Sequence, residues 1–204
     1  MTQYKTIVLF AVLFFAFPCV AETQDEIAQK AEDYLNGIKT MQADFLQVGP
    51  SGDESTGKFY LSRPGKIRWE YEMPSRILII INGSLVSYYD YELNQVSHAP
   101  SGSNLAEFLA HDKILLSGDV KVLSAAEEFG LITITITQSK KTDEGNLTLI
   151  FSDSPMMLKK MIVTDAAEKE TQVTFENQAF DLSLEKDLFI MKDPNLFKKK
   201  DTSH

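Results

Sequence analysis

Residues 57–71 read GKFYLSRPGKIRWEY and residues 77–90 read ILIIINGSLVSYYD, and these two stretches indicate the architecture of the chain. In the first stretch, apolar residues alternate with charged or polar ones, a period of two that is typical of an antiparallel strand with one face in water. The second stretch contains an apolar run that ends at Asn82-Gly83, a dipeptide that favours a tight type I′ hairpin turn. We therefore expect consecutive antiparallel strands here.

The same patterns continue along most of the chain. The alternation predicts roughly ten to twelve strands, a number typical of an antiparallel sheet that curls. Two helices are also predicted: residues 23–38, which are amphipathic, and a short helix that begins at an Asn104–Glu107 capping box and carries Leu105, Phe108 and Leu109. The class is thus α+β and mainly antiparallel. The further predicted strands cover residues 41–48, 56–62, 93–98, 119–124, 132–136, 145–152, 157–164, 170–176 and 187–192.

The first 21 residues have the pattern of a secretory signal peptide. Lys5 precedes an apolar run from Ile7 to Phe17, and small residues stand before the expected cleavage after Ala21. The run is shorter than the roughly 20 residues that a membrane-spanning helix needs. Cleavage would remove Cys19, the only cysteine, so we expect no disulfide, and export would place the product in the periplasm. An acylated Cys19 is the alternative.

Composition restricts the class of protein further. The 204 residues include 20 Lys and Arg against 29 Asp and Glu, and the net charge of -9 disfavours nucleic acid or an anionic membrane as a direct partner. The chain is 44% hydrophobic and 24% charged, which is typical of a globular protein. We expect a signal peptide over residues 1–21 and a single domain over residues 22–204, with a frayed tail over 198–204.

The sequence contains no recognisable catalytic or metal-binding motif. Its three histidines, His98, His111 and His204, do not have the spacing of zinc ligands. No nucleophile elbow, phosphate-binding loop or dinucleotide fingerprint is present. We therefore expect a binding protein without a cofactor or metal. A secreted hydrolase that uses His98 or His111 with a nearby acid is an alternative from another class.

The candidate site is an apolar lining. A strongly curled sheet has a concave side, and two short helices would leave part of that side unfilled, so a cavity for an apolar ligand would result. A fully packed core is the alternative, and periodicity does not separate the two. The expected lining residues are Phe59, Leu61, Ile67, Trp69 and Tyr71. Met156, Met157 and Met161 would add either adaptable contacts or ordinary core packing.

Arg63 is the one charged residue predicted to face inward. Counting by twos from Gly57 places it on the apolar face, at the strand end where Pro64 stops the ladder. A buried guanidinium needs acceptors, and carbonyls that follow Phe108 and Leu109 at the end of the short helix could supply them. An Arg63 side chain that turns into solvent is the alternative.

Together these motifs resemble the periplasmic outer-membrane lipoprotein carrier family, LolA. The likeness lies in residues 43–47 (ADFLQ), residues 57–71, Pro74, and Asn82-Gly83 leading into Tyr88-Tyr89-Asp90, and it extends to about residue 116. The resemblance implies an open half-barrel of roughly 11 strands with a lid of short helices over its concave face. It also implies a hydrophobic cavity that takes the acyl chains of a lipoprotein without any covalent change.

The resemblance further implies partners and a latch. The partners would be acylated lipoprotein cargo, an inner-membrane ABC-type releasing complex and an outer-membrane receptor if one exists, with no nucleic acid and a monomeric carrier. In the family, the arginine of an Arg-Pro pair hydrogen-bonds the lid, and Arg63 with Pro64 matches that pair. Ile67 stands where the family usually has an aromatic residue. A periplasmic sensor or carrier for another amphiphile, such as a glycolipid, is the alternative.

Overall fold

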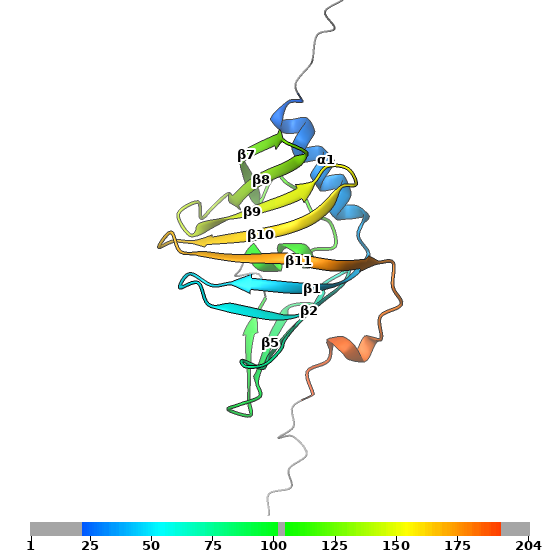
Figure 1. Ribbon diagram of the computed structural model, residues 1–204, viewed down its shortest axis with the longest axis vertical. Coiled ribbons are helices and arrows are strands. Elements are labelled where there is room, and N and C mark those ends of the chain that lie inside the picture. The colour runs from blue at the N-terminus through cyan, green and yellow to red at the C-terminus, as the bar shows by residue number, and fades with distance from the viewer. Residues whose placement is uncertain (1–21, 102–104, 193–204) are drawn as a thin grey trace, which may run out of the picture.

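One antiparallel sheet of eleven strands forms most of the molecule (Figure 1). The computed structural model describes residues 22–101 and 105–192. The strand order is β6-β5-β4-β3-β2-β1-β11-β10-β9-β8-β7, so β6 and β7 form two separate edges and the sheet is not closed. The strands are β1 Thr40–Val48, β2 Glu54–Ser62, β3 Lys66–Tyr71, β4 Ile77–Asn82, β5 Leu85–Asp90, β6 Gln95–Pro100, β7 Val120–Glu128, β8 Leu131–Gln138, β9 Gly145–Ser152, β10 Met157–Asp165 and β11 Glu170–Phe180.

The curled antiparallel sheet predicted from the alternation is confirmed, although several local features differ. The hairpin between β4 and β5 forms as expected, but Asn82 still pairs with Leu85, so Gly83 and Ser84 are the two turn residues. Only Gly83 of these two has a positive φ, 61°, and glycine at the first turn position is typical of a type II′ turn rather than type I′. Strand β6 is shifted by two residues from the predicted 93–98.

Helix α1, Gln24–Gly37, confirms the predicted helix at residues 23–38. Thr23 and Glu26 form a capping box: the Thr23 Oγ1 accepts from the Glu26 N–H at 3.3 Å, and the Glu26 carboxylate accepts from the Thr23 N–H at 2.8 Å. A second helix, η1, is a 3₁₀ helix over Leu105–Ala110, where the short helix was predicted, while Asn104 lies outside the described residues. Figure 1 shows α1 and η1 on the same side of the sheet.

The predicted strand at residues 187–192 is wrong. This segment contains the 3₁₀ helix η2, Lys186–Phe189, which packs across the outer face of the sheet. Phe189 is buried against Leu78 and Ile80 of β4. The neighbouring strands already have their ladder partners, so this apolar segment covers a face instead of adding a strand.

Strand β4 explains why Ile77–Ile81 is apolar throughout. Alternate residues of this strand enter two different clusters: Leu78 and Ile80 pack under η2, while Ile79 and Ile81 belong to the main core on the concave face. A strand that is buried on both sides needs no polar face.

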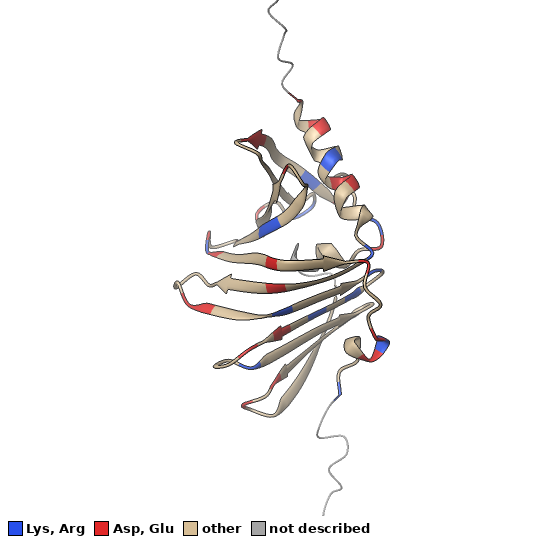
Figure 2. Cartoon of the chain, turned by 45° about the vertical axis from the view of Figure 1, so that its right-hand side comes forward, with Lys and Arg blue, Asp and Glu red and all other residues tan. Residues whose placement is uncertain are grey.

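The concave face is covered by α1, by η1 and by the segment that follows η1. The α1 residues Ile27, Ala31 and Leu35 are buried in the main core together with Phe108, Leu109 and Ile114. Asn36 of α1 makes two hydrogen bonds with the backbone of Ile114, at 2.9 and 2.8 Å, and the Glu32 carboxylate accepts from the Leu116 N–H at 2.8 Å. These bonds hold α1 and the segment after η1 together, and Figure 2 shows α1 beside one end of the sheet.

The expected signal peptide, residues 1–21, and the expected frayed tail, residues 198–204, lie outside the described residues. Within the described part of the chain, no helix has both the length and the hydropathy needed to cross a membrane.

Gly57 of β2 offers a test of this packing. A Cβ atom at Gly57 would overlap the Glu70 carbonyl oxygen and lie 2.7 Å from the ring of Phe45. Overpacking of this kind costs about 1–3 kcal/mol, so Gly57→Ala is expected to lower the free energy of unfolding by about that amount in urea denaturation. Gly37→Ala is the control, because no atom lies within 4 Å of the added carbon. Equal stability of the two variants would contradict the described packing.

Candidate functional site

A groove of about 360 Å³ opens on the concave face of the sheet. Strands β3, β4 and β5 form one wall, and β10 and β11 form the other, so the curl of the sheet brings distant strands to face one another. The volume lies within the roughly 300–1,000 Å³ of typical small-molecule sites. The lining residues are Gln47, Trp69, Tyr71, Ile79, Ile81, Val86, Tyr88, Met161, Val163, Thr171 and Val173.

Aromatic side chains from four strands form the buried floor beside this groove. Phe59 packs against Trp69 with ring centroids 4.5 Å apart, and against Phe175 at 5.2 Å. Phe45 meets Trp69 edge-on at 5.0 Å. The register explains the cluster, because Phe59 pairs with Trp69, and Phe45 pairs with Phe175 on one side and Gly57 on the other.

The groove lining contains no charged side chain. Its polar groups are few: the Tyr71 hydroxyl donates to Gln47 Oε1 at 2.9 Å, and burial raises the pKa of Tyr71 to about 12. Tyr71 is therefore a neutral phenol at physiological pH. Within the described residues, no group of three or more His, Cys, Asp or Glu side chains could hold a metal ion. The arrangement suits the binding of an uncharged, apolar ligand.

Two of the five predicted lining residues, Trp69 and Tyr71, line the groove. The other three, Phe59, Leu61 and Ile67, are at most 1% exposed and belong to the closed core. They share that core with Phe108 and Leu109 of η1, which are 3% and 2% exposed. Leu105 begins η1, but its side chain lies outside the described part of the structure.

The sequence analysis missed lining residues on both walls. Ile79, Ile81, Val86 and Tyr88 come from the predicted β4–β5 hairpin. The opposite wall contains Met161, Val163, Thr171 and Val173. Of these, only Met161 was considered in the sequence analysis, either as an adaptable contact for a ligand or as ordinary core packing. In β11, alternation of Thr171 and Val173 with polar neighbours is a signal that could have identified them, whereas the uniformly apolar Ile77–Ile81 run gives no such signal for β4. Alternation does not show that these two walls face each other across the concave side of the sheet.

Arg63 faces inward, as the alternation predicted, but its guanidinium is isolated. Its Nε, Nη1 and Nη2 atoms are buried and have no hydrogen-bond partner among the described residues. Burial lowers the pKa of Arg63, while the charge of Asp112 opposes that effect. The expected hydrogen bonds from Arg63 to the end of the short helix are therefore not present here.

The turn between β2 and β3 contacts the end of η1 through its backbone instead. The Gly65 N–H donates to the Ala110 carbonyl at 2.8 Å, and the Arg63 N–H donates to the Lys39 carbonyl at 2.9 Å. Pro64 is exposed, and the Arg63–Pro64 peptide bond is cis. The turn therefore lies beside η1, and its described hydrogen bond to η1 comes from the Gly65 backbone and not from the Arg63 side chain.

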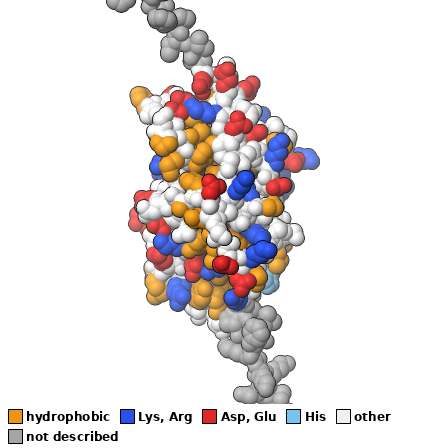
Figure 3. Space-filling model, turned by 90° about the vertical axis from the view of Figure 1, so that its right-hand side faces the viewer, with side chains coloured by type: hydrophobic (Ala, Val, Ile, Leu, Met, Phe, Trp, Pro, Cys, Tyr) orange, Lys and Arg blue, Asp and Glu red, His pale blue; other side chains and the backbone are white. Residues whose placement is uncertain are grey.

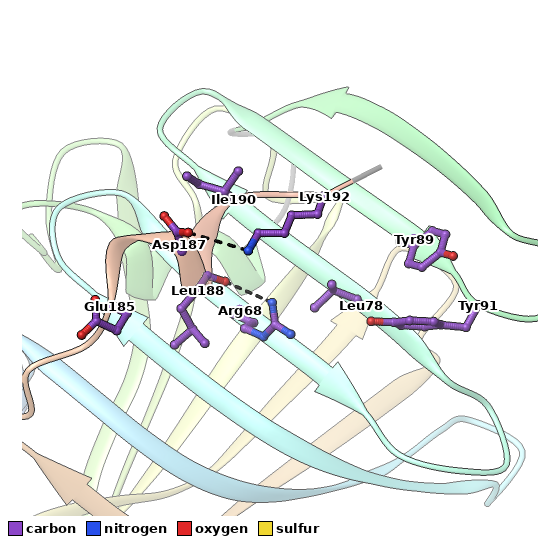
Figure 4. A pocket seen from close by; sticks show the side chains of 9 residues that line it. All are labelled: Arg68, Leu78, Tyr89, Tyr91, Glu185, Asp187, Leu188, Ile190 and Lys192. Atoms are coloured by element: carbon purple, nitrogen blue, oxygen red, sulfur yellow. Dashed lines mark hydrogen bonds and ion pairs between the residues drawn. The ribbon is translucent and has the colours of Figure 1, made fainter. Parts of the chain in front are cut away.

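A second, larger pocket of about 500 Å³ lies on the outer face between the sheet and the segment that contains η2 (Figure 4). Four charged side chains line it, namely Arg68, Glu185, Asp187 and Lys192. The Arg68 Nη1 donates to the Leu188 carbonyl at 3.1 Å. Burying hydrocarbon against charged groups would cost their hydration. The smaller concave groove is therefore the better candidate for an apolar ligand.

His98 and His111 do not lie in the groove lining. His98 of the edge strand β6 is exposed, and its Nδ1 lies 2.9 Å from the Oγ of buried Ser87, its cross-strand neighbour. Among the described contacts, no carboxylate hydrogen-bonds His98. The ring of His111 packs edge-on against Phe108, with centroids 5.9 Å apart.

Comparison with known proteins agrees with this geometry. The family model described as "Outer membrane lipoprotein carrier protein LolA" matches residues 36–192. A relative from Methylococcus capsulatus, named outer-membrane lipoprotein carrier protein, is 29% identical over 95% of this chain and 96% of its own length. A relative of the same name from Chromobacterium violaceum is 30% identical over 78% of this chain and 79% of its own length.

A solved structure of a DUF1329 family protein from Desulfovibrio piger has a TM-score of 0.52 and 12% identity, and covers 80% of this chain and 94% of that one. At this identity the likeness concerns the fold alone. The family match covers well over half of the chain, and it includes all eleven strands. The chain therefore belongs to the outer-membrane lipoprotein carrier family, LolA.

Proposed function

We propose that this protein is a soluble periplasmic carrier, which binds the acyl chains of lipoproteins released from the inner membrane and delivers them to the outer membrane. The observation that carries the proposal is the uncharged apolar groove on the concave face of a LolA-family sheet. The signal-peptide pattern of residues 1–21 supports export. The carrier makes no covalent change to its cargo; it accepts the cargo from a releasing complex and passes it to a receptor or directly to the membrane.

The energetics require such a carrier. Each methylene group moved from an apolar site into water costs about 0.8 kcal/mol. Moving a lipoprotein with three long acyl chains from its membrane into water would therefore cost tens of kcal/mol of free energy. An alternative apolar site removes most of this cost. The groove supplies that site, and it must bind weakly enough to release the cargo afterwards.

The groove in its present form is too small for three acyl chains. Its volume of about 360 Å³ is near the lower end of the roughly 300–1,000 Å³ of sites that bind a single drug-sized molecule, and three long acyl chains are larger than such a ligand. Binding a whole cargo lipid therefore requires the cover to move. Withdrawal of Phe108 and Leu109 would open the core cluster that they share with Phe59, Leu61 and Ile67, and would extend the groove toward η1.

Arg63 would make this movement feasible. A buried guanidinium without acceptors raises the free energy of the closed state, because its hydration is lost and not replaced. Opening the cover would return water to Arg63 and so offset part of the cost of exposing the core. In this proposal Arg63, beside Pro64, acts on the lid by destabilising closure, rather than by a hydrogen bond that fastens it.

Filling the groove tests the binding site. Val86→Trp places a larger side chain in the lining and is expected to weaken the binding of a fluorescent long-chain fatty acid about tenfold, equal to about 1.4 kcal/mol. Ile190→Trp is the matched control, because Ile190 lines the outer pocket and is 50% exposed. Loss of binding in Ile190→Trp with normal binding in Val86→Trp would move the site to the outer face.

Replacing Arg63 tests the lid. Arg63→Leu removes the unpaired charge, so the free energy of unfolding is expected to stay equal or to rise by about 1–3 kcal/mol. Transfer of lipoprotein from inner-membrane spheroplasts to outer-membrane vesicles should slow, since the closed state is favoured. Arg63→Lys, which keeps the buried charge, should transfer faster than Arg63→Leu. Normal transfer by Arg63→Leu would show that Arg63 does not control the lid.

The nature of the cargo is a separate question. Gln47, Tyr88 and Thr171 give the groove a few uncharged polar groups, which would also suit the head group of a glycolipid. We expect mass spectrometry of the protein purified gently from the periplasm to detect lipoprotein acyl chains with their attached peptide. Recovery of only a glycolipid would instead assign the protein to another amphiphile.

A further inference from the structure

The tip of the β7–β8 hairpin presents an aromatic side chain to solvent. Phe129 is 100% exposed, and Leu131, two residues later, is 45% exposed. Single exposed apolar residues are common on protein surfaces. Complete exposure of a phenylalanine is different, because the ring contributes no burial at all to the stability of this fold.

The backbone of the tip also disfavours phenylalanine. Phe129 has a φ of 53° and Gly130 a φ of 75°, so both turn residues are left-handed, as in a type I′ turn. Asn, Asp and Gly adopt this conformation readily, whereas a bulky residue there is an outlier. Neither packing nor turn geometry therefore accounts for Phe129, and an exposed strained residue is a reason to look for a function.

The hairpin tip that carries Phe129 is held by contacts to neighbouring elements. The Asp153 N–H donates to the Gly130 carbonyl at 2.9 Å, which ties the tip to the turn after β9. Lys30 of α1 bridges Glu127 at 3.1 Å and Asp153 at 2.6 Å. Because these contacts hold the backbone of the tip, binding of Phe129 in a pocket would order only its side chain, and this low entropic cost favours docking.

The charges around the tip indicate the kind of partner. Glu127 and Asp153 share one cation, Lys30, and exposed Glu128 adds another negative charge beside Phe129. The end of β7 is red in Figure 2, and acidic side chains also gather near the N-terminal end of α1 in Figure 3. Anionic lipid head groups would be repelled by this surface, whereas Lys and Arg side chains of a protein would be attracted.

The tip lies at the end of the strands opposite the groove. The groove residues Val163 and Thr171 lie near the β10–β11 turn, at the same end as the start of β9. Leu131, next to the tip, pairs with Ser152 at the other end of β9. A partner bound at the β7–β8 tip would therefore leave uncovered the end of the groove near the β10–β11 turn.

We propose that Phe129 and Glu128 form a docking site for a membrane-associated protein with an apolar pocket bordered by Lys or Arg, which receives the ring and faces the carboxylate. The identification of this partner as a membrane-associated protein that supplies or accepts cargo rests on the proposed carrier function. The docking itself does not, because it uses the end of the sheet opposite the cargo groove.

The test measures binding of the purified, cargo-free protein to inner- and outer-membrane vesicles prepared from its host cell. Wild type is expected to bind one of these membranes, with binding that weakens as salt rises and is lost after the vesicles are treated with protease. Phe129→Asn should weaken binding at least tenfold. Its melting temperature should be unchanged or higher, because Asn suits the left-handed turn position. Glu128→Lys should weaken binding most strongly at low salt.

Leu93→Asn is the matched control, since Leu93 is 66% exposed in the β5–β6 turn and should tolerate the change without loss of binding. Equal binding by wild type and Phe129→Asn would overturn the proposal. Equal binding to protein-free vesicles made from the extracted lipids would also overturn it, because the partner would then be the membrane itself. Fatty-acid binding measured on the same samples reports the carrier function independently, so failure of one hypothesis is distinguishable from failure of the other.

Discussion

The concave face of the sheet carries more apolar surface than the rest of the chain covers. Helix α1 and the segment after η1 are fixed to each other by hydrogen bonds that join the side chains of Glu32 and Asn36 to the backbone of Ile114 and Leu116, so the part of the sheet that they cover is limited. Beyond that part, the inner residues of β3–β5 and β10–β11 face one another across open space. A globular domain selected for stability alone would fill such a space, because buried apolar area contributes about 25 cal/mol per Å². The uncovered surface is thus the physical basis of the proposed binding function.

Two opposing contributions affect the free energy of the closed arrangement, in which η1 covers the concave face. Phe108 and Leu109 are almost completely buried, which favours closure through the hydrophobic effect. Arg63 lies at the same end of the sheet with three buried nitrogen atoms and no described partner, which disfavours closure. In the proposed carrier, Arg63 would offset part of the cost of uncovering these residues and so reduce the free-energy difference between the closed and open states. A small difference is what a carrier needs, because neither uptake nor release can then be far uphill.

The sequence predicted local features well and spatial relations less well. Helix α1, the β4–β5 hairpin and the inward direction of Arg63 all follow from capping, turn chemistry and alternation over a few residues. The fate of residues 187–192 does not, because their apolar pattern suits either a strand or a segment that packs on a sheet face, and only the tertiary fold decides between them. The same limit applies to Phe59, Leu61 and Ile67: alternation gives their face of the sheet, but whether they meet a ligand or Phe108 depends on a segment about forty residues away. The family resemblance supplied the half-barrel, which the observed open sheet confirms.

The outer face limits how the groove can enlarge. Leu78 and Ile80 of β4 pack under Phe189, which is 1% exposed, while Ile79 and Ile81 of the same strand form the groove wall. The Asn82 side chain also donates to the Phe189 carbonyl at 3.2 Å, which ties the end of β4 to the η2 segment. Moving this wall outward would therefore break a buried cluster as well as the sheet ladder. The cover on the concave side has no such ladder to break, because η1 contacts the β2–β3 turn through a single described backbone hydrogen bond, from Gly65 to Ala110. In the proposed carrier, displacement of η1 would therefore disrupt fewer backbone contacts than outward movement of the β4 wall.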